Sequence, residues 1–378
     1  MGLSVLFSGV REVRAETGPE VPEITEDTAE APEDTPDISE DVPDPETLNE
    51  LSRVYVSLAG DNRYATAVEV AKYGWGQGET PKSLEIVIVT GKKFPDALAA
   101  SAYCGVAKAP ILLSDLYLLS PETKALIKEW AWRIKKITVI GKEFQPGFYE
   151  DLYALGFSDS KNNMQIIGGD DRYKTAEEVL KATKAIADKE GIFFGTVAVA
   201  TGQAPYDALS FSPWAYREHI PVLLVKDGMG TETTKALISE FQTVYLLGGS
   251  NVCSIDNVSD WQLKIGFVWR LDGANRYLTS EKIAEEFMKD KSYNCCGFGD
   301  GTKQHYVDAL IAGPLQGGLG GPLILTAEGG NGVSDVGPWI QEHLAGDPNV
   351  GTAFFYGWTA QGKSTEYANL LYWIESKD

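Results

Sequence analysis

Residues 60–67 of the chain read Gly-Asp-Asn-Arg-Tyr-Ala-Thr-Ala, and this pattern occurs three times. The second copy, residues 169–176, reads Gly-Asp-Asp-Arg-Tyr-Lys-Thr-Ala, and the third, residues 273–280, reads Gly-Ala-Asn-Arg-Tyr-Leu-Thr-Ser. The first glycines of successive copies are 109 and 104 positions apart. A pattern that returns at nearly constant spacing indicates a tandem repeat, here with three units in 378 residues.

Two further motifs follow in every copy and in the same order. The first is an Asp-Ala-Leu triplet that begins at Asp96, Asp207 and Asp308. A proline stands 14 positions after each of these aspartates and opens an apolar run, which reads Pro-Ile-Leu-Leu, Pro-Val-Leu-Leu or Pro-Leu-Ile-Leu. The triplication therefore covers the chain from about residue 53 to its last residue.

Within each copy, short β-branched runs alternate with stretches of helical periodicity. Residues 84–90 are nearly continuous in apolar residues, which is typical of a strand covered on both faces of a parallel sheet. Residues 97–107 and the stretch after Pro121 predict helices. Strands that alternate with helices predict an α/β fold, namely three tandem Rossmann-like modules, each with a mainly parallel sheet flanked by helices. In the third copy, the glycines between residues 317 and 321 predict either close packing or an early helix end.

Composition divides the chain into four parts. Residues 1–50 are interpreted as a signal remnant, since residues 3–10 are apolar, followed by a disordered acidic linker. Residues 16–50 hold 14 acidic residues, six prolines and no lysine, arginine or aromatic residue, so this segment serves either as a spacer or as a solubilising tail. The three modules are placed at residues 51–160, 161–265 and 266–378.

The charge and hydropathy of the chain exclude some classes of partner. The net charge is −21, and the repeats alone carry −8, which argues against a broad nucleic-acid-binding face. No stretch of 18 or more apolar residues occurs, so we expect no membrane span.

The three motifs together resemble the type 2 cell-wall-binding repeat of Gram-positive surface proteins. The resemblance covers about residues 53–378, and three copies in order make it specific. It implies that the modules associate about a pseudo-threefold axis. It also implies that the protein is secreted to the cell wall, where it binds an anionic, teichoic-acid-like polymer without covalent attachment. The third copy departs from the pattern at Ala274, Ser280 and Gly321.

The arginine of each motif is the candidate polymer-binding residue: Arg63, Arg172 and Arg276. A guanidinium offers a planar fork of donors that suits phosphate or carboxylate oxygens. Several weak sites on one polymer reinforce one another through effective concentration, so we expect multivalent binding. The alternative is a structural arginine that pairs with a repeat aspartate, and one residue can serve both purposes.

The repeat aspartates are interpreted as structural residues and helix caps: Asp96, Asp207 and Asp308. Each follows a strand and turn and opens a helix, where a carboxylate satisfies free backbone amides and repels an incoming phosphate.

Catalytic and metal-binding patterns are missing from the repeated positions. The three histidines and the four cysteines (Cys104, Cys253, Cys295 and Cys296) occupy no common repeat position, and no CxxC, GxSxG, P-loop or dinucleotide-binding motif occurs. We therefore expect no catalytic residue, metal site or cofactor. Cys295 and Cys296 form either a vicinal disulfide or free thiols.

The predicted function is non-covalent anchoring of a secreted surface protein to an anionic wall polysaccharide, without enzymatic activity. Two alternatives stay open. The first is a hydrolase of cell-wall glycan with the aspartates as acids. The second is a surface-layer or adhesion protein whose partner is another surface-layer protein.

Overall fold

The computed structural model describes residues 53–78, 80–204, 206–226, 232–253, 266–289, 293–302, 306–326, 331–345, 350–357 and 370–374. All of them belong to Val42–Asp378, one of the two compact units of the chain. The predicted signal remnant and acidic linker, residues 1–50, lie outside the described residues. Within the described part, no helix is long and apolar enough to cross a membrane.

The described strands form three four-stranded sheets in which every pairing is parallel. In spatial order, the sheets are β3 (Ile111–Ser114), β2 (Leu84–Thr90), β4 (Ile134–Ile140) and β5 (Met164–Ile167); β7 (Val222–Val225), β6 (Thr196–Thr201), β8 (Thr243–Leu247) and β9 (Phe267–Leu271); and β1 (Val54–Leu58), β12 (Thr352–Tyr356), β10 (Cys295–Asp300) and β11 (Leu323–Thr326). Three parallel sheets confirm the predicted fold class.

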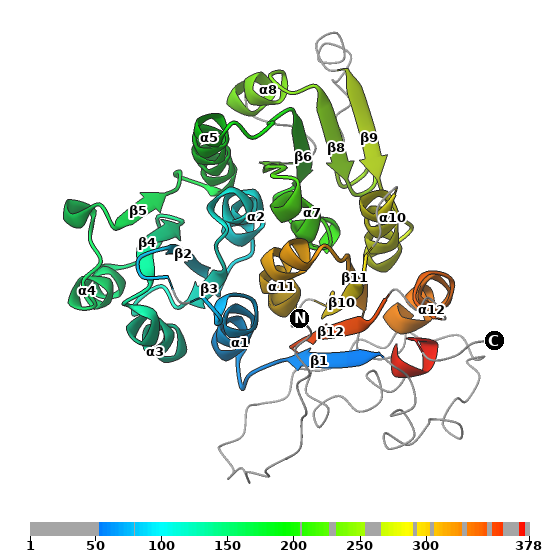
Figure 1. Cartoon of the computed structure of the whole chain (residues 1–378). Helices are drawn as coiled ribbons and strands as arrows, with labels where there is room; N and C mark the ends of the chain where they lie inside the picture. The colour runs from blue at the N-terminus through cyan, green and yellow to red at the C-terminus, as the bar shows by residue number, and fades with distance from the viewer. Residues whose placement is uncertain are drawn as a thin grey trace, which may run out of the picture. The chain divides into compact units, whose positions relative to one another are not determined.

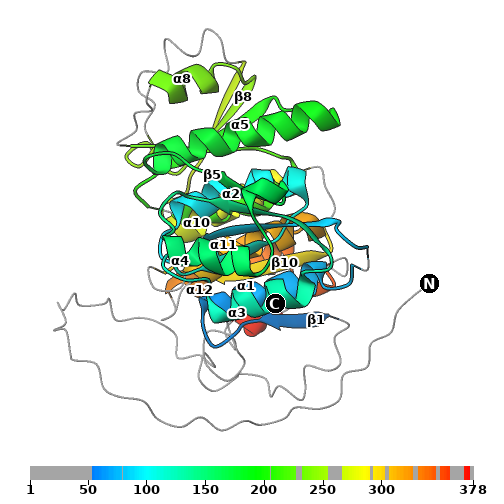
Figure 2. The same ribbon diagram turned by 90° about the vertical axis from the view of Figure 1, so that its left-hand side faces the viewer.

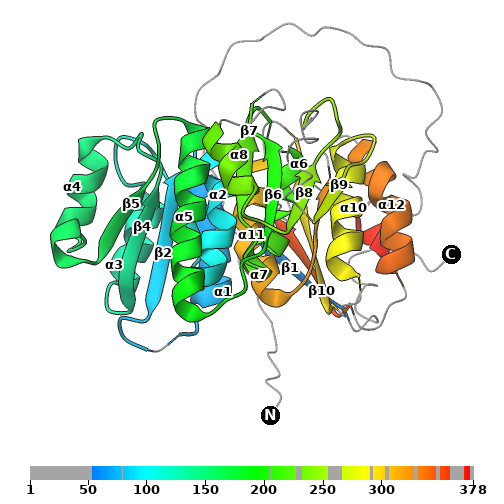
Figure 3. The ribbon, with the colours of Figure 1, turned by 90° about the horizontal axis from the view of Figure 1, so that it is seen from above.

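The helices of the described residues connect these strands. They are α1 (Arg63–Trp75), α2 (Pro95–Ala107), α3 (Pro121–Trp130), α4 (Pro146–Ala154), α5 (Arg172–Glu190), α6 (Tyr206–Leu209), α7 (Ser212–Arg217), α8 (Glu232–Ile238), α10 (Arg276–Met288), α11 (Tyr306–Leu319) and α12 (Asn331–His343), with a 3-10 turn at Asp159–Lys161. In the sheet of β2, α2 covers one face, and α3 and α4 lie on the other (Figure 3). Right-handed crossovers produce this arrangement, because the chain moves one way along the sheet through α2 and back through α3 and α4.

Each sheet takes one strand from the next copy of the repeat. β1 opens the first copy but pairs with β12 of the third, and β5 and β9 likewise pair with β4 and β8 of the preceding copies. The strand that precedes each Arg-Tyr motif therefore belongs to one sheet. The helix that follows the motif packs on the next sheet, as α1 does on β3. Boundaries at residues 51, 161 and 266 thus divide the sequence, while the three sheets exchange a strand across them.

The helices that carry the Asp-Ala-Leu motif (α2 and α11) or directly follow it (α7) meet at the centre of the unit. α2, α7 and α11 contact one another pairwise (Figure 1), and α5 lies alongside α2 (Figure 2). α2 is buried on nearly all sides, because it packs between its own sheet and three other helices. This arrangement agrees with the predicted pseudo-threefold association of the modules.

Glycines allow the central helices to approach closely. A Cβ on Gly313 would lie 2.3 Å from the Ser212 Cβ, and one on Gly317 would lie 2.4 Å from the Pro213 carbonyl oxygen. α11 ends at Leu319, and Gly320 follows with φ +82°. The glycine-rich stretch of the third copy therefore allows close packing, as one alternative predicted, whereas an early helix end is wrong, because α11 ends 11 positions after Asp308 just as α2 ends 11 positions after Asp96. The four cysteines are buried free thiols, so Cys295 and Cys296 form no vicinal disulfide.

Candidate functional site at the module junctions

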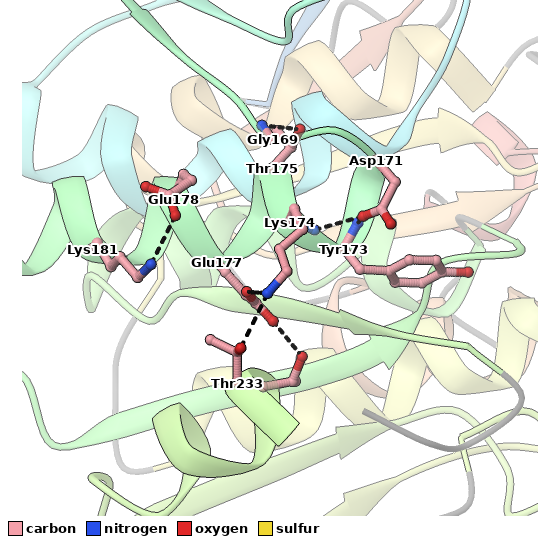
Figure 4. A network of polar contacts seen from close by, with 10 residues as sticks. Gly169, Asp171, Tyr173, Lys174, Thr175, Glu177, Glu178, Lys181 and Thr233 are labelled. Carbon is pink, nitrogen blue, oxygen red and sulfur yellow. Dashed lines mark hydrogen bonds and ion pairs between the residues drawn. The ribbon is translucent and has the colours of Figure 1, made fainter. Parts of the chain in front are cut away.

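The three Arg-Tyr motifs fold into the same capped turn. The side chain of the third motif residue accepts hydrogen bonds of 2.8–3.0 Å from two backbone amides of the following helix, and this residue is Asn62, Asp171 or Asn275. The amide of the first glycine donates to the motif threonine, as Gly169 does to Thr175 at 3.1 Å (Figure 4). The motif is thus a helix start whose orphan amides are satisfied within the turn.

The geometry of the turn explains why the third copy tolerates Ala274. The cap is the neighbouring Asn275, whereas Ala274 and its counterparts Asp61 and Asp170 are exposed and cap nothing in the described turns. The first glycine, in contrast, is required, because a Cβ on Gly273 would lie 2.4 Å from the Leu278 carbonyl carbon. All three copies therefore form equivalent turns.

Each motif arginine is fixed by its own module. Nη1 donates to the carbonyl of the glycine that follows the second strand of the copy: Arg63 to Gly91, Arg172 to Gly202 and Arg276 to Gly301, the last at 2.7 Å. Among the described residues, no other hydrogen bond of these guanidinium groups is found, and each side chain is half-buried. The remaining donors of each guanidinium thus have no hydrogen-bond partner within the described part of the chain.

We use the word junction for the place where each Arg-Tyr turn meets the Asp-Ala-Leu helix of the preceding copy. The helix pairs in contact are α2 with α5, α6 with α10, and α11 with α1, so the third junction closes the cycle. The arginine and the aspartate predicted as alternative partners meet here. The charge of Arg172 acts on Asp96, and that of Arg276 acts on Asp207.

The aspartates lie inside the first turns of their helices. The N-cap of α2 is Phe94, which makes no side-chain cap hydrogen bond, and Asp96 is the second helical residue. The predicted capping role of Asp96 is therefore wrong, because the chain enters the helix at Phe94-Pro95 and the cap position falls on Phe94. Asp207 and Asp308 also lie within the first turns of their helices.

Each aspartate instead packs against a glycine with positive φ at the end of a strand. A Cβ on Gly141 (φ +109°) would lie 2.7 Å from the Asp96 carboxylate. A Cβ on Gly248 (φ +91°) would lie 2.4 Å from the Asp207 carboxylate. One on Gly357 (φ +77°) would lie 2.4 Å from the Asp308 carboxylate. The amide of each glycine donates to the last residue of the exchanged strand, as Gly141 does to Ile167. The aspartates thus pack where a strand from the next copy completes each sheet.

Burial in the junctions shifts the titration of these carboxyls. It raises the pKa of Asp96 to about 6, with a further rise from Glu143 and an opposing effect from Lys93 and Arg172. Burial also raises the pKa of Asp207, and a hydrogen bond from Thr279 and the charge of Arg276 oppose that rise. Both carboxyls are therefore harder to ionise than an exposed aspartate.

The junction of the first two modules is hollowed and lined by charged side chains. The hollow, of about 380 Å³, is bounded by Lys93, Pro95, Asp96, Lys142, Glu143, Gly169, Asp170, Asp171, Arg172 and Thr175. Lys93 pairs with Glu143 at 2.6 Å, and Lys142 lies 3.9 Å from Asp170. Both pairs are exposed, where such contacts are worth at most about 1 kcal/mol, so a strongly anionic ligand can displace them.

The same turn carries a buried polar network in the second copy (Figure 4). Glu177 is fully buried and accepts from Lys174 at 2.6 Å and from Thr234 at 2.7 Å. Lys174 also donates to Thr233 of α8. This network ties α5 to α8, so we assign it a structural role.

Sequence reasoning missed three aromatic residues beside the arginines: Phe94, Tyr206 and Tyr306. They stand two, one and two positions before the repeat aspartate, so they do not fall on a common repeat position. The signal that could have found them is an aromatic residue within two positions of every repeat aspartate. Across the described residues, no group of three or more histidine, cysteine or acidic side chains could hold a metal ion.

Comparison with known proteins decides the family. A family model described as cell wall binding domain 2 matches residues 57–145, 166–258 and 270–350. The chain belongs to this family. The matched segments contain all three turns and all three repeat aspartates.

Two relatives of this chain are from Bacillus subtilis (strain 168). The N-acetylmuramoyl-L-alanine amidase LytC is 27% identical over 275 residues, which cover 71% of this chain and 49% of the amidase. An amidase enhancer is 30% identical over 260 residues, which cover 68% of this chain and 32% of the enhancer. The chain thus spans about half or less of these relatives, and the shared part is the binding region.

Two solved structures from Clostridium difficile share the fold. Cwp6 matches with a TM-score of 0.73 and 24% identity over 86% of this chain and 48% of Cwp6. Cwp8 matches with a TM-score of 0.67 and 23% identity over 87% of this chain and 54% of Cwp8. These neighbours confirm the arrangement of three α/β modules in this cell wall binding domain 2 chain.

Proposed function

We propose that this chain anchors a secreted surface protein to the cell wall by multivalent, non-covalent binding of an anionic, teichoic-acid-like polymer. The observation that carries the proposal is that Arg63, Arg172 and Arg276 make the same hydrogen bond in all three copies. Each guanidinium donates to one backbone carbonyl, and its other donors make no hydrogen bond to the described residues. An arginine held in this way loses little side-chain entropy when it binds phosphate or carboxylate.

Three arginines on one rigid unit can engage several charged groups of the same polymer. A hydrogen bond to a charged group contributes about 1.5–3 kcal/mol when it is shielded and less when it is exposed. Weak contacts of this size yield firm retention only when they act together through effective concentration. Binding should therefore depend on ionic strength, because salt screens exposed charges.

A hydrolase would need a carboxylic acid near a second carboxylate, and Asp96 lies close enough to Glu143 for the two charges to interact. We favour binding because Asp207 and Asp308 occupy the same backbone setting, against a glycine with positive φ. Structure therefore explains the burial of Asp96 without catalysis.

The proposal is tested by co-sedimentation of the chain with Gram-positive walls before and after chemical removal of the anionic polymer. We expect retention on intact walls, loss of retention after removal, and a marked decrease when ionic strength rises from about 0.05 M to about 0.5 M. Retention that survives polymer removal would contradict the proposal and would favour a protein partner. Release of sugars or peptides from the wall would favour the hydrolase.

A further inference from the structure

We infer that the three junction arginines and the three aromatic rings between them form one axial site, which holds a single anionic sugar segment of the polymer. This inference rests on the proposed function and names the part of the molecule that contacts the ligand. It predicts one occupied site in each chain, where independent junctions would give three.

The aromatic rings of the three copies lie together. The centroid of the Tyr306 ring is 6.1 Å from that of Phe94 and 6.1 Å from that of Tyr206. Both pairs are edge-to-face, with interplanar angles of 86° and 90°. This geometry is favourable for aromatic pairs. Because the three residues come from three different copies, the cluster lies where the modules meet.

An arginine of the following copy lies beside each ring. The Arg276 Cζ is 3.4 Å from the Tyr206 ring centroid, and the Arg172 Cζ is 5.6 Å from that of Phe94. Burial raises the pKa of Tyr306, and the charge of Arg63 opposes that rise, which places Arg63 near the third ring. The order of contacts is cyclic, so the arginines of all three junctions lie beside one aromatic cluster.

The chemistry of the cluster fits a phosphorylated or otherwise anionic sugar. Each guanidinium has donors left after its bond to a glycine carbonyl, and these suit phosphate or carboxylate oxygens. The three rings are half-buried, so part of their apolar surface is available to the carbon face of a sugar. The aspartates behind them are the buried carboxyls of the junctions, and burial disfavours their negative charge.

The lysines of the first hollow do not belong to this site. Lys93 and Lys142 are exposed and engaged with carboxylates. Their counterparts at the second junction are Ala204 and Gly249, which follow the same strands at the same offsets. An axial site built from all three copies cannot depend on cations that the second junction lacks.

The first test is an NMR titration of the chain, with labelled tyrosine rings, against glucose 1-phosphate. We expect concentration-dependent shifts of the Tyr206 and Tyr306 rings and none at Tyr117, a tyrosine that is 68% exposed on the first module. Inorganic phosphate and methyl glucoside serve as probes of each half of the ligand and should bind more weakly. Unchanged Tyr206 and Tyr306 signals, or equal shifts at Tyr117, would overturn the inference.

The second test measures stoichiometry with a synthetic glucosylated poly(glycerol phosphate) oligomer by titration calorimetry. We expect one oligomer per chain and a several-fold weaker affinity in Tyr306→Leu, with Tyr117→Leu as the matched control. Three oligomers per chain, or equal affinities of the two variants, would overturn the axial site.

Retention on walls separates the two proposals. If polymer removal abolishes retention while Tyr306→Leu binds walls like the unchanged chain, the axial site fails and the proposed function stands. If retention does not depend on the polymer, the proposed function itself fails. Circular dichroism of each variant confirms that the fold is kept.

Discussion

The junction of the first two modules and that of the second and third share a backbone but differ in charge. In both, an aspartate faces a glycine with positive φ, and an arginine donates to a glycine carbonyl. Only the first adds lysines, at positions 93 and 142, where the second has Ala204 and Gly249. The shared aspartate, glycine and arginine therefore form the backbone arrangement of both junctions, and the lysines are not needed for the fold.

The largest expected effect is a loss of unfolding free energy when the shared contact between glycine and aspartate is changed. Gly248→Ala places a Cβ 2.4 Å from the Asp207 carboxylate at φ +91°, so we expect a loss of about 3 kcal/mol or more in unfolding free energy. The matched control is Gly191→Ala, where φ is +68° but no atom lies within 4 Å. That variant should lose only about 1 kcal/mol, from backbone strain alone. Urea unfolding of both variants checks this, and equal losses would show that the contact with Asp207 does not matter.

A smaller effect concerns pH. Because burial raises the pKa of Asp96 from its ordinary 3.8 to about 6, the folded state disfavours the carboxylate. Ionisation of this carboxyl does not lower the unfolding free energy below about pH 4. The loss of unfolding free energy grows as pH rises to about 6 and then stays constant at up to about 3 kcal/mol. Asp96→Asn should therefore lose less stability than the unchanged chain between pH 4 and pH 6.

Urea unfolding at several pH values measures the slope of unfolding free energy against pH. This slope does not depend on any constant effect that the asparagine amide of the variant has on stability. Asp207 has a raised pKa as well, so part of the pH dependence should remain in the Asp96 variant. Identical slopes in the two proteins would contradict a buried Asp96.

The smallest expected effect comes from exchanging the residues that differ. Lys142→Gly and Gly249→Lys move one cation between junctions, and a Cβ on Gly249 would meet nothing closer than 3.9 Å. Since exposed ion pairs contribute at most about 1 kcal/mol, wall retention should change by no more than a few-fold. Unfolding free energy should stay the same. A large loss of stability in either variant would show that the two junctions do not share one architecture.

The sequence predicted the repeat and most strands, because runs such as residues 84–90 and 196–201 are rich in β-branched and other apolar residues, whereas the equivalent run of the third copy, residues 295–300, is interrupted by glycines. β5 and β9 were not predicted, since each is short and its side chains alternate between buried and half-exposed or exposed. Exchange of these strands between copies has no sequence signal, because pairing partners are chosen by tertiary packing. A linear repeat therefore leaves the sheet boundaries undetermined.

The candidate site was predicted in part. Arg63, Arg172 and Arg276 were found because they recur at one position, and the structure places all three at junctions. The direct contact of these arginines with polymer stays a prediction. Asp96 was predicted as a cap although the cap position is Phe94, because a strand and turn before a helix do not reveal which residue is the cap.

The most direct test compares two folded variants for retention on intact walls: Arg63, Arg172 and Arg276 changed together to alanine, and Lys93 and Lys142 changed together to alanine. The structure predicts that the triple arginine variant loses at least tenfold in wall affinity, because it removes several charge-assisted contacts at once. The double lysine variant should retain most of its affinity. Undiminished binding by a folded triple variant would contradict the claim that the arginines shared by all three junctions hold the wall polymer.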